Sequence, residues 1–453
     1  MTGFYTALTS SVIFPLHERL KGHQSAAVRQ QMEHSQWWTR DQLLELQLQR
    51  LRALLVDVGA HVPYYRQLFA SLRFEPPALS CLEELRQLPL LTKIEIRAHT
   101  KALEHENASG LARFNTGGSS GEPLIFYISK ARVSHDVAAK WRATRWWGVD
   151  IGDPEVVVWG SPIEVGAQDR VRRWRDRLLR TELLPAFEMS EGRLDQFVQA
   201  IRRRRPRMLF GYPSALSLIA QHAAKRGVAM DDLGIRVAFV TSERLYDHQR
   251  ATISRVFGCS VANGYGGRDA GFIAHECPAG GMHITAEDIV VELLGPDGNP
   301  VAEGEAGEIV VTHLATRDFP FIRYRTGDMA IMDTATRCAC GRGLPMLREI
   351  QGRTTDFVMA ADGTVMHGLA LIYVVRDLPG VEAFKIVQET LQRTTVQMVV
   401  NKGFDRSRQM QIVAGLRQRL GQGVDVDVQF VDRIAPEKSG KFRYVISHAV
   451  ENR

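Results

Sequence analysis

The stretches YPSALSLIAQHAAKRG at 212–227 and RVAFVTSE at 236–243 define the repeating pattern of this chain. The first places apolar residues three and four positions apart, which predicts an amphipathic helix, and the second is an apolar run of strand length. EVVVWG at 155–160 is another run of that kind. Strands that alternate with helices in this way indicate α/β layers.

The pattern differs on both sides of this α/β region. Upstream, TRDQLLELQLQRLRALLVDVGAHVPYY at 39–65 opens with Thr and has Gln three residues later, a capping box that predicts a helix ending before Pro63. We expect its buried stripe at Leu44, Leu48, Leu51, Leu55 and Val58. Downstream, DIVVELL at 288–294 and GEIVVTH at 307–313 flank a PDGNP turn, so a β-rich piece follows.

The last hundred residues predict a small α+β domain. They contain TTVQMVV at 394–400, a helix-like RQMQIVAGLRQRLG at 408–421 and the alternating VDVDVQFVD at 424–432. We place the boundary between residues 352 and 353. The expected architecture is therefore a large multi-layer α/β domain with a β-rich piece at 1–352 and a small, mobile α+β domain at 353–453.

Composition restricts the class of protein. A chain of 453 residues with 45% apolar and 24% charged residues is typical of a globular protein with two or three domains, and its net charge of +6 is modest. It shows no charged and apolar leader and no apolar run near 18 residues, so we expect a cytoplasmic protein without a transmembrane segment. The run from Val12 to Pro15, followed by Lys21, predicts a buried N-terminal turn rather than membrane contact.

Two basic runs, RVRRWRDRLLR at 170–180 and RRRRPR at 202–207, are interpreted as solvated helix faces. Coenzyme A phosphates or other polyanions are the alternative partners. Because aromatic residues are not regularly interleaved with the arginines, we expect no nucleic-acid partner.

The loop in FNTGGSSGEPLIFY at 114–127 has the glycine and hydroxyl density of a phosphate-binding loop, without the Gly–Lys–Ser/Thr ending of a P-loop. Consecutive glycines let backbone N–H groups converge on an anion, and Thr116, Ser119 and Ser120 add hydroxyl donors. The segment is therefore able to hold a polyphosphate. A Gly–Ser turn that joins two strands is the alternative reading.

Four further segments follow this loop in order: NGYGGRDAGFIAHEC at 263–277, FIRYRTGDMA at 321–330 with Asp328 in an expected turn, QGRTTD at 351–356 and PEKSGKFR at 436–443. Together the five resemble the motifs of the adenylate-forming superfamily of acyl-CoA synthetases and adenylation domains. The phrases SQWWTRDQL, HVPYYRQLF, GYPSAL and CACGRGLPMLREIQGR resemble the phenylacetate–CoA ligase and CapK-type subfamily. The resemblance covers nearly the whole chain.

This resemblance implies ATP- and Mg²⁺-dependent activation of a carboxylic acid as acyl-AMP, followed by transfer to coenzyme A, within the setting of polysaccharide biosynthesis. It implies that 1–352 binds nucleotide and acid and that 353–453 carries the catalytic Lys441. The ammonium of Lys441 would stabilise charge that develops in the transition state. The implied nucleotide-binding residues are Thr116, Gly117, Gly118, Ser119, Ser120, Gly121, Glu122, Pro123, Thr241, Ser242, Glu243, Tyr265, Gly266, Asp328 and Arg353.

Within this set, the first eight residues would hold phosphates, Thr241 to Glu243 and Tyr265 would lie along the adenine, and Asp328 would accept hydrogen bonds from the ribose hydroxyls. Arg353 would contact ribose and phosphates. Asp269 stands where the family usually has a Glu that places Mg²⁺, so we expect contact through water. Thr355 replaces a usual acid at the hinge.

The chain has five cysteines, Cys81, Cys259, Cys277, Cys338 and Cys340. An odd number in a long chain without a leader argues against a disulfide framework. The last three, with His283, form a Cys₃His set of the kind that binds structural zinc, and His275 is a rival for the fourth position. The subfamily resemblance also implies a zinc-like cluster here. Reduced thiols without a metal are the alternative.

Two other functions remain open. In one, the acyl group passes to an amine or hydroxyl of a sugar or another acceptor. In the other, the chain is an inactive nucleotide-binding scaffold. The acid is not identified, although its pocket is expected to include Trp159, Tyr212 and the segment 264–267, and the family likeness suggests a homodimer.

Overall fold

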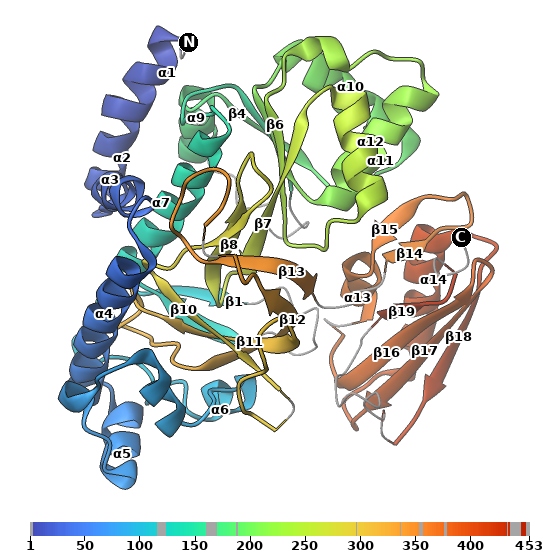
Figure 1. Ribbon diagram of the computed structural model, residues 1–453. Coiled ribbons are helices and arrows are strands. Elements are labelled where there is room, and N and C mark those ends of the chain that lie inside the picture. The colour runs from blue at the N-terminus through green and yellow to red at the C-terminus, as the bar shows by residue number, and fades with distance from the viewer. Residues whose placement is uncertain are drawn as a thin grey trace. The chain divides into compact units, whose positions relative to one another are not determined.

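The computed structural model describes residues 3–115, 124–159, 170–186, 189–295, 297–335, 337–352, 357–375, 378–432, 434 and 445–449. The described residues up to 352 form one compact unit and those from 357 onward form another (Figure 1). The functions assigned to the two parts from the sequence stay predictions.

The helices of the first unit are α1 (Phe4–Leu8), the π-helix η1 (Thr9–Ile13), α2 (Phe14–Leu20), α3 (Ser25–Ser35), α4 (Arg40–His61), α5 (Pro63–Leu72), η2 (Pro76–Ala78), η3 (Leu82–Gln87), α6 (Lys93–Ala98), α7 (Lys130–Trp146), α9 (Arg170–Leu178), α10 (Glu191–Arg204), α11 (Pro213–Lys225), η4 (Asp231–Leu233) and α12 (Asp247–Phe257).

Its strands are β1 (Ala112–Asn115), β2 (Ile125–Ile128), β3 (Glu155–Trp159), β4 (Thr181–Pro185), β5 (Met208–Gly211), β6 (Val237–Thr241), β7 (Ser260–Gly267), β8 (Gly271–Glu276), β9 (Met282–Ile284), β10 (Ile289–Leu294), β11 (Ala306–His313), β12 (Tyr324–Met332) and β13 (Met346–Gly352). Eleven of them form one sheet in the order β10-β11-β12-β13-β9-β8-β7-β6-β5-β3-β4, and β1 pairs with β2.

Helices cover both faces of the parallel part of this sheet, which runs from β4 to β7. Side chains of a strand point alternately to opposite faces. Leu209 of β5 accordingly packs with α10, α11 and α12, whereas Met208 and Phe210 pack on the side of α7 (Figure 1). These are the predicted α/β layers, and β3 and β6 are the strands expected within the two apolar runs.

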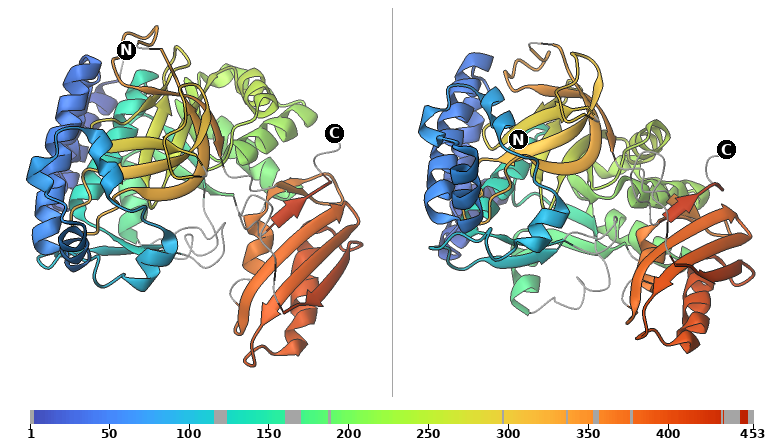
Figure 2. Two further views of the ribbon diagram at one scale, coloured as in Figure 1. Left: turned by 60° about the horizontal axis from the view of Figure 1, so that its bottom comes forward. Right: turned by 90° about the horizontal axis from the view of Figure 1, so that it is seen from below.

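From β7 onward the sheet becomes antiparallel. Strands β10 and β11 pair from Ile289↔His313 to Leu294↔Glu308, which is the β-rich piece expected from the sequence. Figure 2 shows the blue helices of the N-terminal region lying outside the yellow strands of this part. Leu51, Leu55 and Val58 of α4 pack in the same core as Ile289 and Ile309.

Helix α4 begins at the predicted capping box, in which the Thr39 side chain accepts from the backbone N–H of Gln42. Its buried stripe was predicted wrongly at the first turns. Leu44 is exposed, and Leu43 is buried together with Gln47. Gln47 is polar, so the sequence does not mark it as part of the buried stripe. Its burial is possible because its side-chain amide donates to the Ile289 carbonyl across 3.1 Å.

A buried ion pair ties the N-terminal helices to the sheet. Glu287 Oε1 accepts hydrogen bonds from Arg142 Nη1 at 2.6 Å and from Ser35 Oγ at 2.7 Å. The side chains of Arg142 and Glu287 are 1% and 2% exposed. Such a pair is weak evidence for net stability, but the removal of one partner is costly.

The second unit contains β14 (Phe357–Met359), β15 (Val365–His367), α13 (Leu369–Val375), β16 (Val381–Thr390), β17 (Arg393–Val400), η5 (Arg406–Arg408), α14 (Gln409–Leu420), β18 (Asp425–Phe430) and β19 (Val445–Ser447). Four strands form a sheet in the order β18-β17-β16-β19. Helices α13 and α14 share its core through Ile372 and Leu416. This arrangement is the predicted α+β architecture.

Candidate active site and metal centre

The side chains of Tyr265 on β7 and Asp328 on β12 meet although three strands separate them in the sheet. Tyr265 Oη donates to Asp328 Oδ2 across 2.9 Å. Four strand spacings of about 4.8 Å would place these strands roughly 19 Å apart in a flat sheet. The sheet is therefore strongly curled, and this curling brings together two residues that the sequence predicted to serve the nucleotide.

Asp328 does not lie in the turn that the sequence predicted. It lies within β12, where the register with β11 shifts between Glu308 and Val310. Gly327 has a φ of 79°, and the N–H of Asp328 donates to Thr326 Oγ1 across 3.1 Å. The bulge interrupts the ladder and redirects the side chain, so the turn-like composition of RTGD marks a bulge inside a strand.

Asp269 is 7% exposed and lies between β7 and β8. Its Oδ2 accepts from Tyr324 Oη at 2.6 Å, and its Oδ1 accepts from the N–H of Ala270 at 3.1 Å. A Cβ on Gly267 would lie 2.6 Å from Asp269 Oδ1, which explains glycine at this position. Tyr324 was not identified from the sequence, because a tyrosine inside a strand carries no local signal of its partner.

Thr241 is the last residue of β6, and Ser242 and Glu243 follow it. Ser242 has a φ of 72°, in the left-handed region that a non-glycine residue adopts at a cost. Glu243 Oε2 accepts from the N–H of Ser214 across 3.3 Å, at the start of α11. The carboxylate of Glu243 thus caps a helix, whereas Thr241 and Ser242 line the adjoining cavity.

That cavity has a volume of about 550 Å³ and lies on the α7 side of the parallel strands. Its walls include Trp159, Phe210, Phe272, Trp141, Thr241, Ser242, Gly266 and Gly267. Trp159 was expected in the acid pocket and lines this cavity. Tyr212 was also expected there, and it stacks on Trp159 with ring centroids 4.4 Å apart.

Lys140 and Glu155 are charged residues of the cavity wall, which also includes Asp136, Asp150, Asp153 and Arg268. Lys140 Nζ is 3.6 Å from the centroid of the Phe210 ring and 3.6 Å from Glu155 Oε1. Both residues line the cavity. The sequence did not identify them, since a lysine on a helix and a glutamate at the start of a strand are common on solvated surfaces.

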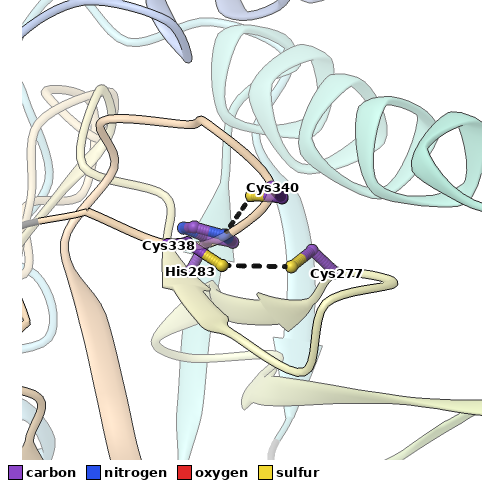
Figure 3. Close-up of side chains that lie close together, drawn as sticks. All are labelled: Cys277, His283, Cys338 and Cys340. Carbon is purple, nitrogen blue, oxygen red and sulfur yellow. Dashed lines mark hydrogen bonds between the residues drawn. The ribbon is translucent and has the colours of Figure 1, made fainter.

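The predicted Cys₃His cluster is assembled in the structure (Figure 3). One ligand atom from each of Cys277, His283, Cys338 and Cys340 lies within 4.8 Å of the others. The Sγ atoms of Cys277 and Cys338 are 3.7 Å apart. Zn–S bonds of about 2.3 Å in a tetrahedron place two sulfurs roughly 3.8 Å apart, so the spacing fits Zn²⁺.

His283 is oriented as a metal ligand. Its Nδ1 lies 3.2 Å from the carbonyl oxygen of Leu344, which only accepts, so Nδ1 carries the proton and the lone pair of Nε2 faces the cluster. That Nε2 is 3.2 Å from Cys340 Sγ. A Cβ on Gly281 would lie 2.7 Å from Cys338 Sγ, so only glycine leaves the donor atoms room.

Burial shapes the protonation of the cluster. It lowers the pKa of His283 to about 4, which keeps the imidazole neutral, and raises the pKa of the Cys277 thiol to about 12. A divalent cation would displace that thiol proton. The rival ligand His275 is outside this group; its ring packs near Phe239 and Phe272.

Other predicted site residues lie outside the described residues. They are Thr116, Gly117, Gly118, Ser119, Ser120, Gly121, Glu122, Pro123, Arg353 and Lys441. The hinge position Thr355 lies outside them as well. Their predicted roles stay predictions.

Comparison with known proteins defines the class. Residues 183–315 match the family model described as "AMP-binding enzyme", and residues 358–448 match "CapK C-terminal domain". The first range holds Thr241, Ser242, Tyr265 and Asp269. The resemblance to adenylate-forming enzymes, and within them to phenylacetate–CoA ligases and CapK-type proteins, is confirmed.

Particular relatives span most of the chain. Protein CapK of Staphylococcus aureus is 23% identical over 409 residues, covering 90% of this chain and 89% of that protein. Phenylacetate-coenzyme A ligase of Thermus thermophilus is 27% identical over 331 residues, covering 71% and 72%. A solved 2-hydroxyisobutyryl-CoA ligase superposes with a TM-score of 0.66 at 20% identity, covering 92% and 91%, which confirms the fold class.

Proposed function

We propose that the protein is an AMP-forming acid–CoA ligase that activates a carboxylic acid as acyl-AMP and transfers the acyl group to coenzyme A. The observation that carries this proposal is the bond between Tyr265 and Asp328 beside an apolar cavity, of which Gly266 is a wall. A carboxylate that is held in place can accept hydrogen bonds from the ribose of a nucleotide, and the cavity beside it can hold the acid. The AMP-binding match over 183–315 supports the same activity.

The chemistry has two steps. In the first, a carboxylate oxygen of the acid attacks the α-phosphorus of ATP, and the bond to pyrophosphate breaks. In the second, the thiol of coenzyme A loses its proton, its sulfur attacks the acyl carbon, and AMP leaves with the bonding electron pair. Acyl-AMP makes this possible because AMP is a far better leaving group than the oxygen of a free carboxylate.

Each residue takes a defined part in this proposal. Asp328, held by Tyr265, accepts hydrogen bonds from the ribose hydroxyls, and Arg353 contacts the ribose and phosphates. The loop 116–123 holds the phosphates through backbone N–H groups and hydroxyls. Lys441 stabilises the charge that develops on the reacting oxygens. The part of the chain from 353 onward moves so that Lys441 approaches for the first step and withdraws for the second.

Mg²⁺ would neutralise phosphate charge, and Asp269 is the residue proposed to place it. Both carboxylate oxygens of Asp269 already accept a hydrogen bond, from Tyr324 and from Ala270. An oxygen with a remaining lone pair suits a water ligand of Mg²⁺, an ion that keeps several of its waters. This arrangement supports the water-mediated contact expected from the short side chain.

The cavity is the proposed acid-binding site. Its aromatic walls, among them Trp159, Phe210 and Phe272, suit an acid with an aryl or similarly apolar body. The name of the phenylacetate-coenzyme A ligase relatives agrees with that class.

We further propose that the Cys₃His cluster binds one structural Zn²⁺. The four ligands close the coordination shell, which leaves no position for a substrate.

Among the described residues no helix is both long and apolar enough to cross a bilayer. A cytoplasmic setting, where ATP and coenzyme A are available, and a homodimer complete the proposal.

A second function keeps the first step and changes the acceptor to an amine or hydroxyl, for instance on a sugar. The specific observation in its favour is the similarity to CapK, which covers 90% of the chain, whereas the similarity to the phenylacetate-coenzyme A ligase of Thermus thermophilus covers 71%. The C-terminal unit also matches a CapK domain.

AMP release separates the two functions. With an accepted acid and ATP, the leading proposal expects AMP release that depends on coenzyme A, with formation of an acyl-CoA thioester. Release that depends on an amino sugar or a hydroxyl acceptor, and is unaffected by coenzyme A, would establish the second function instead.

A further inference from the structure

An apolar stripe runs along the outer side of the N-terminal helix, which comprises α1, η1 and α2. We call it the N-terminal stripe; its members are Phe4, Leu8, Val12, Leu16 and Leu20. Phe4 is 85% exposed and Leu20 81%. Eight of the fourteen large apolar side chains that are exposed among the described residues lie either on this helix or on α9. Scattered exposed apolar residues are normal, but a concentration of this kind indicates a contact surface.

The shape of the helix keeps the stripe together. Residues four apart in an α-helix are displaced by about 40° around the axis, so a stripe with this spacing would wind around the helix. The turn from Thr9 to Ile13 is a π-helix, which has more residues per turn and reverses part of that displacement. The sequence predicted a buried N-terminal turn here. The run from Val12 to Pro15 is helical rather than a turn, and the prediction of burial holds only in part, because Phe14 is buried whereas Val12 is 53% exposed.

The exposed charged residues around the stripe are cationic. Glu18 is the only acidic residue between 3 and 24, and it is 5% exposed. Its Oε2 accepts from Ser25 Oγ at 2.7 Å and is bonded to His23 Nδ1 at 3.0 Å. Arg19 and Lys21 are exposed at the end of the helix. The exposed surface of this segment thus combines apolar side chains with positive charge and has no exposed carboxylate.

The neighbouring helix α9 extends this surface. Tyr5 Oη donates to the carbonyl of Leu178 across 2.7 Å, so the two helices are in contact; Figure 1 shows them side by side at the edge of the unit. Trp174 of α9 is 73% exposed, and Arg177, three residues further on, is exposed as well. The one acid of α9, Asp176, pairs with Arg175.

We propose that the N-terminal stripe and α9 together bind the surface of an anionic lipid bilayer. Apolar side chains enter the boundary between headgroups and acyl chains, tryptophan sits at that boundary, and Arg and Lys pair with lipid phosphates. A second copy of the chain fits this surface less well. A two-fold contact would bring two copies of the same cationic surface together, with no exposed acid of the N-terminal segment to neutralise the charge.

The test is co-sedimentation of the full chain with vesicles of phosphatidylcholine alone and of phosphatidylcholine mixed with phosphatidylglycerol. The wild type is expected to prefer the anionic vesicles. The double variant Phe4→Ser/Leu20→Ser is expected to bind the anionic vesicles at least about tenfold more weakly, because it removes two inserted side chains. The double variant Arg19→Glu/Lys21→Glu should lose the preference for anionic lipid.

Ile94→Ser/Met410→Ser is the matched control, since those side chains are 74% and 75% exposed on other elements. It should bind vesicles as the wild type does. All substituted residues are highly exposed, so the variants should keep the wild-type melting temperature. Equal binding by wild type and Phe4→Ser/Leu20→Ser, or binding to neither vesicle, would overturn the proposal. Light scattering that shows a dimer dissociated by Phe4→Ser/Leu20→Ser, without vesicle binding, would identify an interface between copies instead.

Discussion

Tyr265 donates a hydrogen bond to Asp328 across 2.9 Å, and the two residues are 63 positions apart in the sequence. Tyr324 and Asp269 make a second contact between the same two parts of the sheet at 2.6 Å. Both contacts exist only because the sheet curls between β7 and β12. The site is thus fixed by the tertiary fold rather than by any single motif.

Tyr265→Phe should weaken ATP binding while it keeps the aromatic ring. A hydrogen bond to a charged group contributes about 1.5 kcal/mol or more, so the KM for ATP should rise about tenfold. Steady-state kinetics at a saturating acid concentration measure this. Tyr5→Phe removes a tyrosine hydrogen bond that involves neither Asp328 nor Asp269 and is the control, with KM for ATP unchanged. An unchanged KM in Tyr265→Phe would mean that the bond does not position Asp328 for the nucleotide.

Asp269→Asn should raise the Mg²⁺ concentration needed for half-maximal activity, because it removes the charge and leaves the size of the side chain nearly the same. Tyr324→Phe keeps the charge and loses only one hydrogen bond, so its effect on the Mg²⁺ titration should be smaller. Titration of both variants at fixed ATP checks the order. If Asp269→Asn reaches half-maximal activity at the same Mg²⁺ concentration as the wild type, the metal is placed by another residue.

The purified protein should contain about one zinc per chain, and His283→Gln should remove it and lower the melting temperature. His275→Gln is the matched control: it also replaces a buried imidazole, 1% exposed, but lies outside the cluster and should retain zinc. Metal analysis of both variants after dialysis decides between the two histidines. A zinc content well below one per chain in the wild type would contradict the zinc site and favour reduced thiols without a metal.

Glu287→Gln should destabilise the first unit by about 3–5 kcal/mol, because it leaves Arg142 charged and buried without its counter-ion. The double variant Arg142→Met/Glu287→Leu removes both charges, so its free energy of unfolding should fall less than that of Glu287→Gln. Urea unfolding measures both. Glu33→Gln breaks pairs whose acid is 25% exposed and should cost no more than about 1 kcal/mol. Equal losses in Glu287→Gln and Glu33→Gln would show that burial of the pair is unimportant.

The sequence predicted those features that local patterns encode. Thr39 and Gln42 mark the start of α4 because a capping box involves neighbours, and the alternation of strands and helices gave the layers. The Cys₃His cluster could be predicted because few other roles suit two thiols separated by one residue. The family resemblance, read from ordered motifs, was confirmed by the comparisons.

The remaining features depend on contacts that the sequence does not show. The bulge at Asp328 looked like a turn, since both use glycine and small polar residues. Gln47 interrupted the stripe of α4 because its hydrogen bond is made to a residue 242 positions away. Lys140 and Glu155 enter the cavity only after α7 packs on β3, so no periodicity distinguishes them from surface charges.

The central claim is tested most directly by acid-dependent pyrophosphate release from ATP, measured across aryl, fatty and amino acids for the wild type, Asp328→Ala and Lys441→Ala. The account predicts release that requires one class of acid, with an aryl acid expected, and that falls by a factor of about 10² or more in Lys441→Ala. It also predicts a higher KM for ATP in Asp328→Ala. Release from no acid while ATP still binds to the wild type would contradict the account and favour a nucleotide-binding scaffold.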